Sequence, residues 1–222
     1  MESIILFIGM LALPSIAFTM VSIAFGNHFE TNIKNKLSGF EVARKILDNN
    51  DLKNMYIVEI KGNLNDHYDY NQKVIRLSSD VYHGENVSSA IIAAKICSYA
   101  IQDKENNLFM KFRFVLNQFV TFDVYVGYIL FIVGLCLQDF SIIRLSAMLL
   151  LVAIVFHLIT LPVEFDATKK AKESLDNYDI LNKEEIEKGT GLFRALPYMY
   201  LMTILTSISN FYNEIVYNIK KK

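Results

Sequence analysis

The stretch Val87–Gln102 reads VSSAIIAAKICSYAIQ, and the interpretation of the fold starts from it. An apolar run of this length without turn residues predicts a helix, and apolar residues on all sides of a helix predict that it is buried. The polar residues of its second half are Lys95, Ser98, Tyr99 and Gln102. Their spacing of i, i+3, i+4 and i+7 places all four on one helix face. The sequence therefore predicts a buried helix with one polar stripe, and the candidate site lies on that stripe.

The residues that precede this helix predict a small region of mixed helix and strand. Ser38-Gly39-Phe40-Glu41 fits a capping box, in which a hydroxyl and a carboxylate bind the free amides of the first helical turn. We expect this helix to end at Asn49-Asn50-Asp51. The segments Met55–Ile60 and Lys73–Leu77 are rich in β-branched and aromatic residues, which predicts two strands that pair with each other.

Long apolar runs occupy much of the remaining chain, which is 53% hydrophobic overall. Ser3–Gly26 contains no Asp, Glu, Lys or Arg, and a helix of that length reaches roughly 36 Å, enough to cross a bilayer. Similar runs lie at Val115–Gln138, Leu145–Val163 and Ala195–Tyr212. We therefore expect an α-rich (α+β) integral membrane protein with about four transmembrane helices, multi-pass in the cell membrane, and neither a soluble enzyme nor a secreted domain.

The expected organisation has five parts. They are transmembrane helix 1 at 1–26, a cytoplasmic part at 27–114, a transmembrane hairpin of helices 2 and 3 at 115–163, a cytoplasmic helical segment at 164–194, and transmembrane helix 4 with a basic tail at 195–222. Lys and Arg residues gather beside both long polar segments, which places those segments on the cytoplasmic side.

Charge and composition exclude several classes of function. The net charge is −1 with no large field of one sign, which argues against a nucleic-acid partner. The chain has no glycine-rich phosphate loop, so a nucleotide is not expected. Its two cysteines, Cys97 and Cys136, make no disulfide framework.

Several blocks of the sequence together resemble a known family. They are Gly39–Leu47 (GFEVARKIL), Asp66–Asp69 (DHYD), Lys73–Ser78 (KVIRLS), Ala93-Ala94 with Ala100-Ile101-Gln102, and Leu161–Ala167 (LPVEFDA). In order, spacing and hydropathy these blocks resemble the neutral zinc metallopeptidases of bacterial membranes over essentially the whole chain. The resemblance implies a zincin-like arrangement of residues 27–114. It also implies His-Glu-x-x-His on the buried helix, where two histidines bind zinc and the glutamate activates the bound water.

This chain departs from the family at the residues that carry the chemistry. Lys95 stands where the resemblance places the first histidine, Ile96 where it places the glutamate, and Tyr99 where it places the second histidine. Glu164, the third ligand that the resemblance implies, remains, with Asp166 two residues later. Lysine is a cation at neutral pH and isoleucine cannot take a proton. We therefore predict a degenerate site with no catalytic residue, no metal and no cofactor.

The lost ligands suggest a specific contact in place of the metal. A buried ammonium and a buried carboxylate are each costly alone, and pairing relieves much of that cost. Because the resemblance implies that the helix face and Glu164 converge, we predict a Lys95–Glu164 ion pair, with Tyr99 donating to the carboxylate. In the alternative, Lys95 extends to solvent and Glu164 caps a helix.

Two functions follow from these residues. The first is a non-catalytic homologue of a metallopeptidase that binds a membrane-protein client or regulates an active paralogue, in contact with the lipid bilayer. The second is an active membrane metallopeptidase with an altered metal site that uses Glu164 together with His67 or His157.

Overall fold

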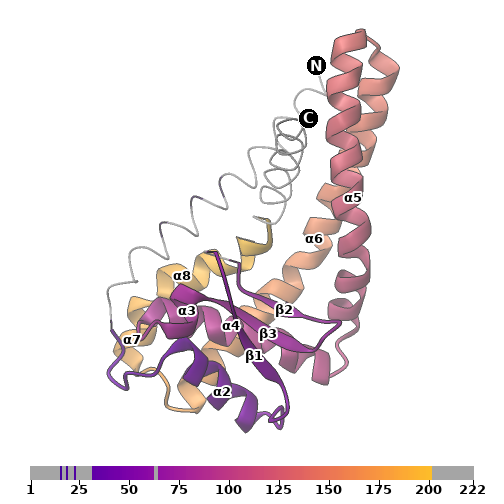
Figure 1. Ribbon diagram of the computed structural model, residues 1–222. Coiled ribbons are helices and arrows are strands. Elements are labelled where there is room, and N and C mark those ends of the chain that lie inside the picture. The colour runs from indigo at the N-terminus through magenta and orange to yellow at the C-terminus, as the bar shows by residue number, and fades with distance from the viewer. Residues whose placement is uncertain (1–15, 17–18, 20–22, 24–31, 63–64, 202–222) are drawn as a thin grey trace, which may run out of the picture. The chain divides into compact units, whose positions relative to one another are not determined.

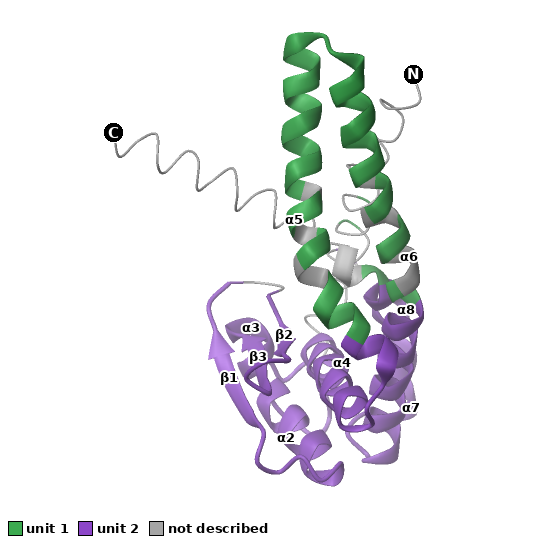
Figure 2. Cartoon of the chain, turned by 90° about the vertical axis from the view of Figure 1, so that its right-hand side faces the viewer, with its two compact units in different colours: residues 1–20, 112–161, 198–222 green, residues 21–111, 162–197 purple. Residues whose placement is uncertain are grey.

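The computed structural model describes residues 16, 19, 23, 32–62 and 65–201. The chain divides into two compact units (Figure 2). Unit 1 comprises residues 1–20, 112–161 and 198–222, and unit 2 comprises residues 21–111 and 162–197. The expected first transmembrane helix at 1–26, apart from three single residues, and the part of the expected fourth helix beyond residue 201 lie outside the described residues.

The described elements are helices, with one group of three short strands between α2 and α3 (Figure 1). In chain order they are α2 (Gly39–Asn49), β1 (Tyr56–Ile60), β2 (His67–Asp69), β3 (Val74–Ser78), α3 (Ser79–His83), α4 (Val87–Lys104), α5 (Leu108–Leu137), α6 (Phe140–Asn177), α7 (Lys183–Lys188), α8 (Thr190–Ala195) and the 3-10 helix η1 (Leu196–Leu201).

The sheet of unit 2 has three strands in the order β1-β3-β2. The two predicted strands are confirmed as β1 and β3, and they pair in parallel with Ile57 opposite Ile75. The short strand β2 lies between them in sequence and pairs antiparallel with β3, with Tyr68 opposite Ile75. Because β2 has only three residues, it is too short to show the alternating pattern that marks a strand. Strand β3 lies at the centre of the sheet, and its side chains Ile75 and Leu77 are buried.

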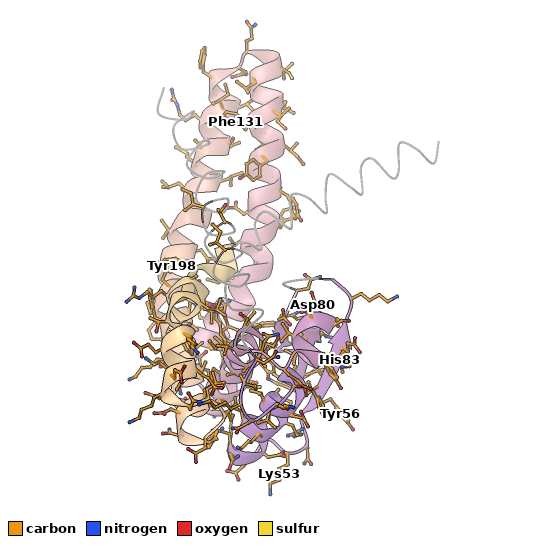
Figure 3. The ribbon with its side chains drawn as sticks, turned by 90° about the vertical axis from the view of Figure 1, so that its left-hand side faces the viewer. Lys53, Tyr56, Asp80, His83, Phe131 and Tyr198 are labelled. Atoms are coloured by element: carbon orange, nitrogen blue, oxygen red, sulfur yellow. The ribbon has the colours of Figure 1, made fainter. Side chains whose placement is uncertain are left out.

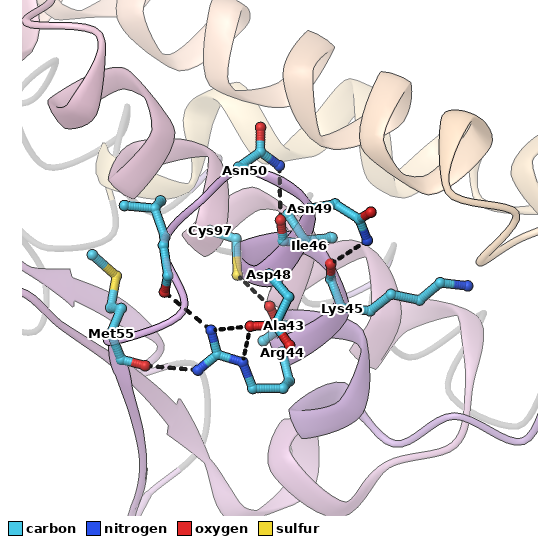
Figure 4. Close-up of polar contacts among 10 residues, drawn as sticks. Ala43, Arg44, Lys45, Ile46, Asp48, Asn49, Asn50, Met55 and Cys97 are labelled. Atoms are coloured by element: carbon cyan, nitrogen blue, oxygen red, sulfur yellow. Dashed lines mark hydrogen bonds and ion pairs between the residues drawn. The ribbon is translucent and has the colours of Figure 1, made fainter.

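The first described helix, α2, begins with the predicted capping box. Glu41 N–H donates to Ser38 Oγ at 3.3 Å, and Ser38 N–H donates to Glu41 Oε2 at 2.8 Å. The Arg44 side chain then joins α2 to the chain that enters β1 (Figure 4). It donates to the carbonyl of Met55 at 2.8 Å and to that of Leu52 at 3.0 Å. These bonds fix the direction in which the chain leaves α2 for the sheet.

Helix α4 is the buried core of unit 2. Every residue from Val87 to Gln102 is buried, as the sequence predicts for this run. Its first turn is capped by Asn86, whose side-chain oxygen accepts from Ser89 N–H at 2.9 Å. Because α4 is buried, the polar side chains of its stripe need hydrogen-bond partners from other parts of the protein.

Gly39, the first residue of α2, permits a close approach of two backbones. A Cβ at this position would lie 2.0 Å from the carbonyl oxygen of Val81. We expect Gly39→Ala to lower the free energy of unfolding by about 1–3 kcal/mol, because backbone atoms would have to move. Denaturant unfolding followed by circular dichroism measures this loss.

Gly189→Ala is the matched control for that measurement. Its added Cβ would meet the Cδ1 atom of Ile91 at 2.4 Å, which is the end of a flexible side chain. A smaller loss is expected at Gly189 than at Gly39. Equal losses at the two positions would contradict the close backbone approach.

Unit 1 contains a hairpin made by most of α5 and the first part of α6. At the turn, a Cβ on Gly134 would lie 2.8 Å from Ile143 Cγ1, so the two helices approach closely there. Phe131 is buried within this hairpin, whereas many apolar side chains of α5 are exposed (Figure 3). Helix α6 continues through Pro162 to Asn177, so the residues that follow the third apolar run are helical up to that point.

The expectation of a multi-pass integral membrane protein with about four transmembrane helices is wrong for the part of the chain that is described. No helix in this part has the combination of length and apolar character that a membrane span requires. The expectation weighed the length of the apolar runs, whereas a span also needs nearly continuous apolar character. Of the charged residues on α5, Asp123 lies inside the run Val115–Gln138 that was expected to span the membrane.

Candidate functional site

The polar stripe of α4 meets α6 inside unit 2. Lys95 Nζ lies 2.8 Å from Glu164 Oε2, and Tyr99 OH donates to the same oxygen at 2.7 Å. These contacts confirm the predicted ion pair and the predicted tyrosine donor. The alternative in which Lys95 extends to solvent is wrong, because its side chain is only 2% exposed and that of Glu164 is fully buried.

Lys95 also reaches a third element. Its ammonium donates to the main-chain carbonyl of Leu196, the residue that follows α8. One lysine therefore joins α4, α6 and the end of α8.

The burial of this pair gives it large energetic consequences. Each ion loses its hydration on burial, and the attraction between them offsets that loss only when the geometry is good and further hydrogen bonds are present. Tyr99 and the Leu196 carbonyl supply two such further hydrogen bonds. The Lys95 ammonium also lies 5.8 Å from the centroid of the Tyr99 ring.

The stripe continues two turns along α4 at Gln102. Its amide nitrogen donates to Asp166 Oδ2 at 2.7 Å and to the carbonyl of Val163 at 3.2 Å. Its amide oxygen, Oε1, is buried and has no hydrogen-bond partner among the described residues. Asp166 is thus bound by Gln102 and stands beside the ion pair on α6.

The other residues of the former motif carry no reactive group into this site. Ile96 is buried, with 2% of its surface exposed. Ser98 Oγ donates to the carbonyl of Ala94 at 2.9 Å, as a helical serine commonly does. Cys97 Sγ lies 3.7 Å from the carbonyl of Ala43 (Figure 4), and burial raises the pKa of its thiol. Cys97 is therefore a buried packing residue and not a reactive thiol.

The block Asp66–Asp69 around His67 has a structural role in the described part of the chain. Asp66 is buried and its carboxylate accepts from the backbone and hydroxyl of Ser78, which joins the start of β2 to the end of β3. Burial raises the pKa of the Asp66 carboxyl, and the bonds from Ser78 oppose that shift. His67 Nδ1 lies 2.7 Å from the carbonyl of Asn65 at an exposed position. The side chain of His157 lies outside the described residues.

The residues present do not fit the zinc ion that the family resemblance implies. Among the described side chains, no three His, Cys, Asp or Glu groups lie close enough together to hold a metal ion. At the place of the first expected ligand, an ammonium already binds the one remaining carboxylate. A protonated lysine has no lone pair for a metal, and its charge repels one.

The Leu196 carbonyl and the Gln102–Asp166 bond are not predicted by the sequence patterns. For Gln102, the spacing from Lys95 on the polar stripe is the signal that the sequence offers. The Leu196 contact joins residues 101 positions apart through a backbone atom. A backbone carbonyl has no sequence signature, so no pattern of residue types could have indicated this contact.

The fold and the site together bring Lys95 and Glu164, two residues at positions where the resemblance implies zinc ligands, into a buried ion pair. A profile of the family described as "Putative neutral zinc metallopeptidase" matches residues 3–218, and the chain belongs to this family. The chain is also similar to the "Putative membrane protease YugP" of Bacillus subtilis (strain 168), with 31% identity over 205 residues, which cover 92% of this chain and 91% of the relative. No solved structure matches the chain.

Proposed function

We propose that this chain is a non-catalytic member of its family, a pseudoenzyme that uses the scaffold to bind a client polypeptide or to regulate an active relative. The buried contact between Lys95 and Glu164 is the observation that carries this proposal. A zinc-dependent peptidase needs an open metal position and a base beside the bound water. In this chain the Lys95 ammonium binds the Glu164 carboxylate, and the Ile96 side chain cannot act as a base.

Cleavage of a fluorogenic casein substrate tests the proposal. The purified chain, with zinc added, is expected to show no cleavage that a zinc chelator abolishes. We expect this result because Lys95 is not a metal ligand and Ile96 is not a proton acceptor. Chelator-sensitive cleavage would instead support the second function, an altered metal site that uses Glu164 with His67 or His157.

The exposed face of α5 supports lipid contact as a further part of the proposal. Phe112, Val115, Phe119 and Phe122 are 54–71% exposed, and their spacing places them in one stripe of the helix. Exposed apolar surface of this extent marks a membrane or protein interaction site. The relative from Bacillus subtilis is itself named a membrane protease. We therefore propose that this stripe contacts the surface of a lipid bilayer.

The variant Phe112→Asp/Phe119→Asp/Phe122→Asp is expected to bind lipid at least about tenfold more weakly than the unaltered chain. Each buried phenylalanine contributes about 1.5–3 kcal/mol when it leaves water, and the aspartates add a cost. Flotation with phosphatidylcholine vesicles measures the bound fraction.

Tyr56→Asp is the control for the flotation assay. Tyr56 lies on β1 in unit 2 (Figure 3) and is 75% exposed, which makes it an apolar surface residue outside the stripe. Its substitution is expected to leave flotation unchanged. Equal flotation of the triple variant and the unaltered chain would exclude the stripe as the lipid contact.

A further inference from the structure

The Lys95 ammonium holds a main-chain carbonyl, which is the group that any polypeptide could present. The carbonyl belongs to Leu196, at the end of α8. Leu192 and Leu196 are both fully buried, so this end of α8 is inserted into unit 2 and does not lie loosely on its surface. The contact therefore has the form of a bound peptide in which the ligand is a segment of the same chain.

The segment that contains α8 lies along the first half of α4, up to the first residue of the site. A Cβ on Gly189, just before α8, would lie 2.4 Å from Ile91 Cδ1 and 3.3 Å from Val87 Cγ1. Seven residues later, the Leu196 carbonyl meets Lys95 on the following turn of α4. The segment 189–196 thus lies along α4 from its first turns to the ion pair.

Gln102 supplies a second observation that points to a peptide ligand. It lies seven residues after Lys95 on the same face, about 10 Å along the helix axis. Its buried Oε1 has no hydrogen-bond partner among the described residues, although a buried acceptor of this kind normally has one. A donor for a carbonyl at Lys95 and an acceptor for an N–H at Gln102 together match the polar groups of a polypeptide main chain, and about three extended residues span that distance.

We infer that α8 and Leu196 are an internal occupant of a polypeptide-binding site on α4, and that a client segment binds there by displacing them. This inference rests on the proposed client-binding function and adds both the site and its regulation. In the closed state the Leu196 carbonyl occupies the ammonium. In the open state the ammonium binds a client carbonyl, and a client that extends along α4 beyond Lys95 can present an N–H to Gln102 Oε1.

A labelled peptide with the sequence of residues 190–201, TGLFRALPYMYL, is the probe for this inference. Leu192→Ala weakens the packing of α8 without altering Lys95, so the site is open for a larger fraction of the time. Since the apparent dissociation constant scales inversely with the open fraction, the peptide is expected to bind Leu192→Ala at least about tenfold more tightly than the unaltered chain. Fluorescence anisotropy measures both constants.

Two further variants make this test specific. Leu47→Ala removes the same atoms from a fully buried leucine of α2 and is expected to leave peptide affinity unchanged. In the Leu192→Ala background, the neutral pair Lys95→Met/Glu164→Gln is expected to lose most of the peptide binding, because the ammonium donor is gone. Equal affinity of the Leu192→Ala variant and the unaltered chain, or peptide binding that survives loss of the ammonium, would overturn the inference.

Hydrogen exchange on the unaltered chain gives a second readout that needs no variant. Saturating peptide is expected to speed exchange at the amides of residues 192–196, because these residues leave their buried site. Unchanged or slower exchange there would overturn the inference. Chelator-sensitive cleavage of casein would overturn the proposed non-catalytic function instead, so the two failures are distinguishable.

Discussion

A Lys95→Met variant is expected to lose about 3–5 kcal/mol of its free energy of unfolding. The substitution removes the ammonium that lies 2.8 Å from the buried carboxylate of Glu164. It also removes the donor to the Leu196 carbonyl, which joins α8 to α4. Burying a carboxylate without a nearby cation is costly, so the loss should far exceed that of an ordinary surface substitution. Denaturant unfolding followed by circular dichroism measures it.

The same helix offers a matched control for this loss. Lys104 Nζ lies 3.1 Å from Asp51 Oδ2, but the lysine side chain is 43% exposed and the aspartate side chain 88% exposed. Exposed pairs of this kind contribute about 0–1 kcal/mol, so Lys104→Met is expected to have little effect. Comparable losses for Lys95→Met and Lys104→Met would contradict the energetic role of the buried pair.

The double variant Lys95→Met/Glu164→Gln separates the charge from the packing. It replaces both ions with neutral side chains of similar volume, and such replacements of buried pairs are often neutral or stabilising. We expect it to recover most of the stability that Lys95→Met loses. Recovery would show that the carboxylate left without its cation causes the loss.

The second large effect is expected from the variant Lys95→His/Ile96→Glu/Tyr99→His, which introduces the motif that the family resemblance implies. Its zinc content is expected to rise to about one ion per chain, because two histidines one helical turn apart then join Glu164 as ligands. Plasma mass spectrometry after dialysis against metal-free buffer measures the metal. Thermal unfolding with and without zinc should show a zinc-dependent gain in stability, since an ion that binds only the folded state stabilises it.

Adding Glu164→Gln to that variant is the control for the third ligand. A neutral amide oxygen is a weaker zinc ligand than a carboxylate, so this quadruple variant is expected to retain less zinc than the triple variant Lys95→His/Ile96→Glu/Tyr99→His. A folded triple variant with no more zinc than the unaltered chain would contradict the view that this scaffold differs from a metallopeptidase only at the replaced residues.

Local patterns predicted the elements around the site well. The capping box at Ser38 is present, and the buried run Val87–Gln102 is a single helix. Each of these features depends on residues that are close in sequence, and a spacing rule therefore describes it. The pairing of Lys95 with Glu164 was predicted across 69 positions only because the family resemblance brought the two elements together.

Features that depend on distant backbone atoms were not predictable in the same way. The three-residue strand β2 forms because β3 offers it a free edge, and its own residues show no strand pattern. The Leu196 carbonyl meets Lys95 because α8 packs along α4, and no side chain at Leu196 indicates it. For the described residues the expectation of membrane spans is wrong for a related reason, because the number of apolar residues in a run does not determine how continuous the apolar surface of the helix is.

The zinc content of the purified, unaltered chain tests the central claim most directly. After dialysis against metal-free buffer, plasma mass spectrometry is expected to find close to zero zinc per chain, because the Lys95 ammonium binds the carboxylate that a metal would need. The triple variant Lys95→His/Ile96→Glu/Tyr99→His, dialysed in parallel, is the positive control that shows whether a bound zinc ion survives the dialysis. About one zinc per unaltered chain would contradict the account, since a metal held by the family's scaffold requires three converging ligands that the described residues do not provide.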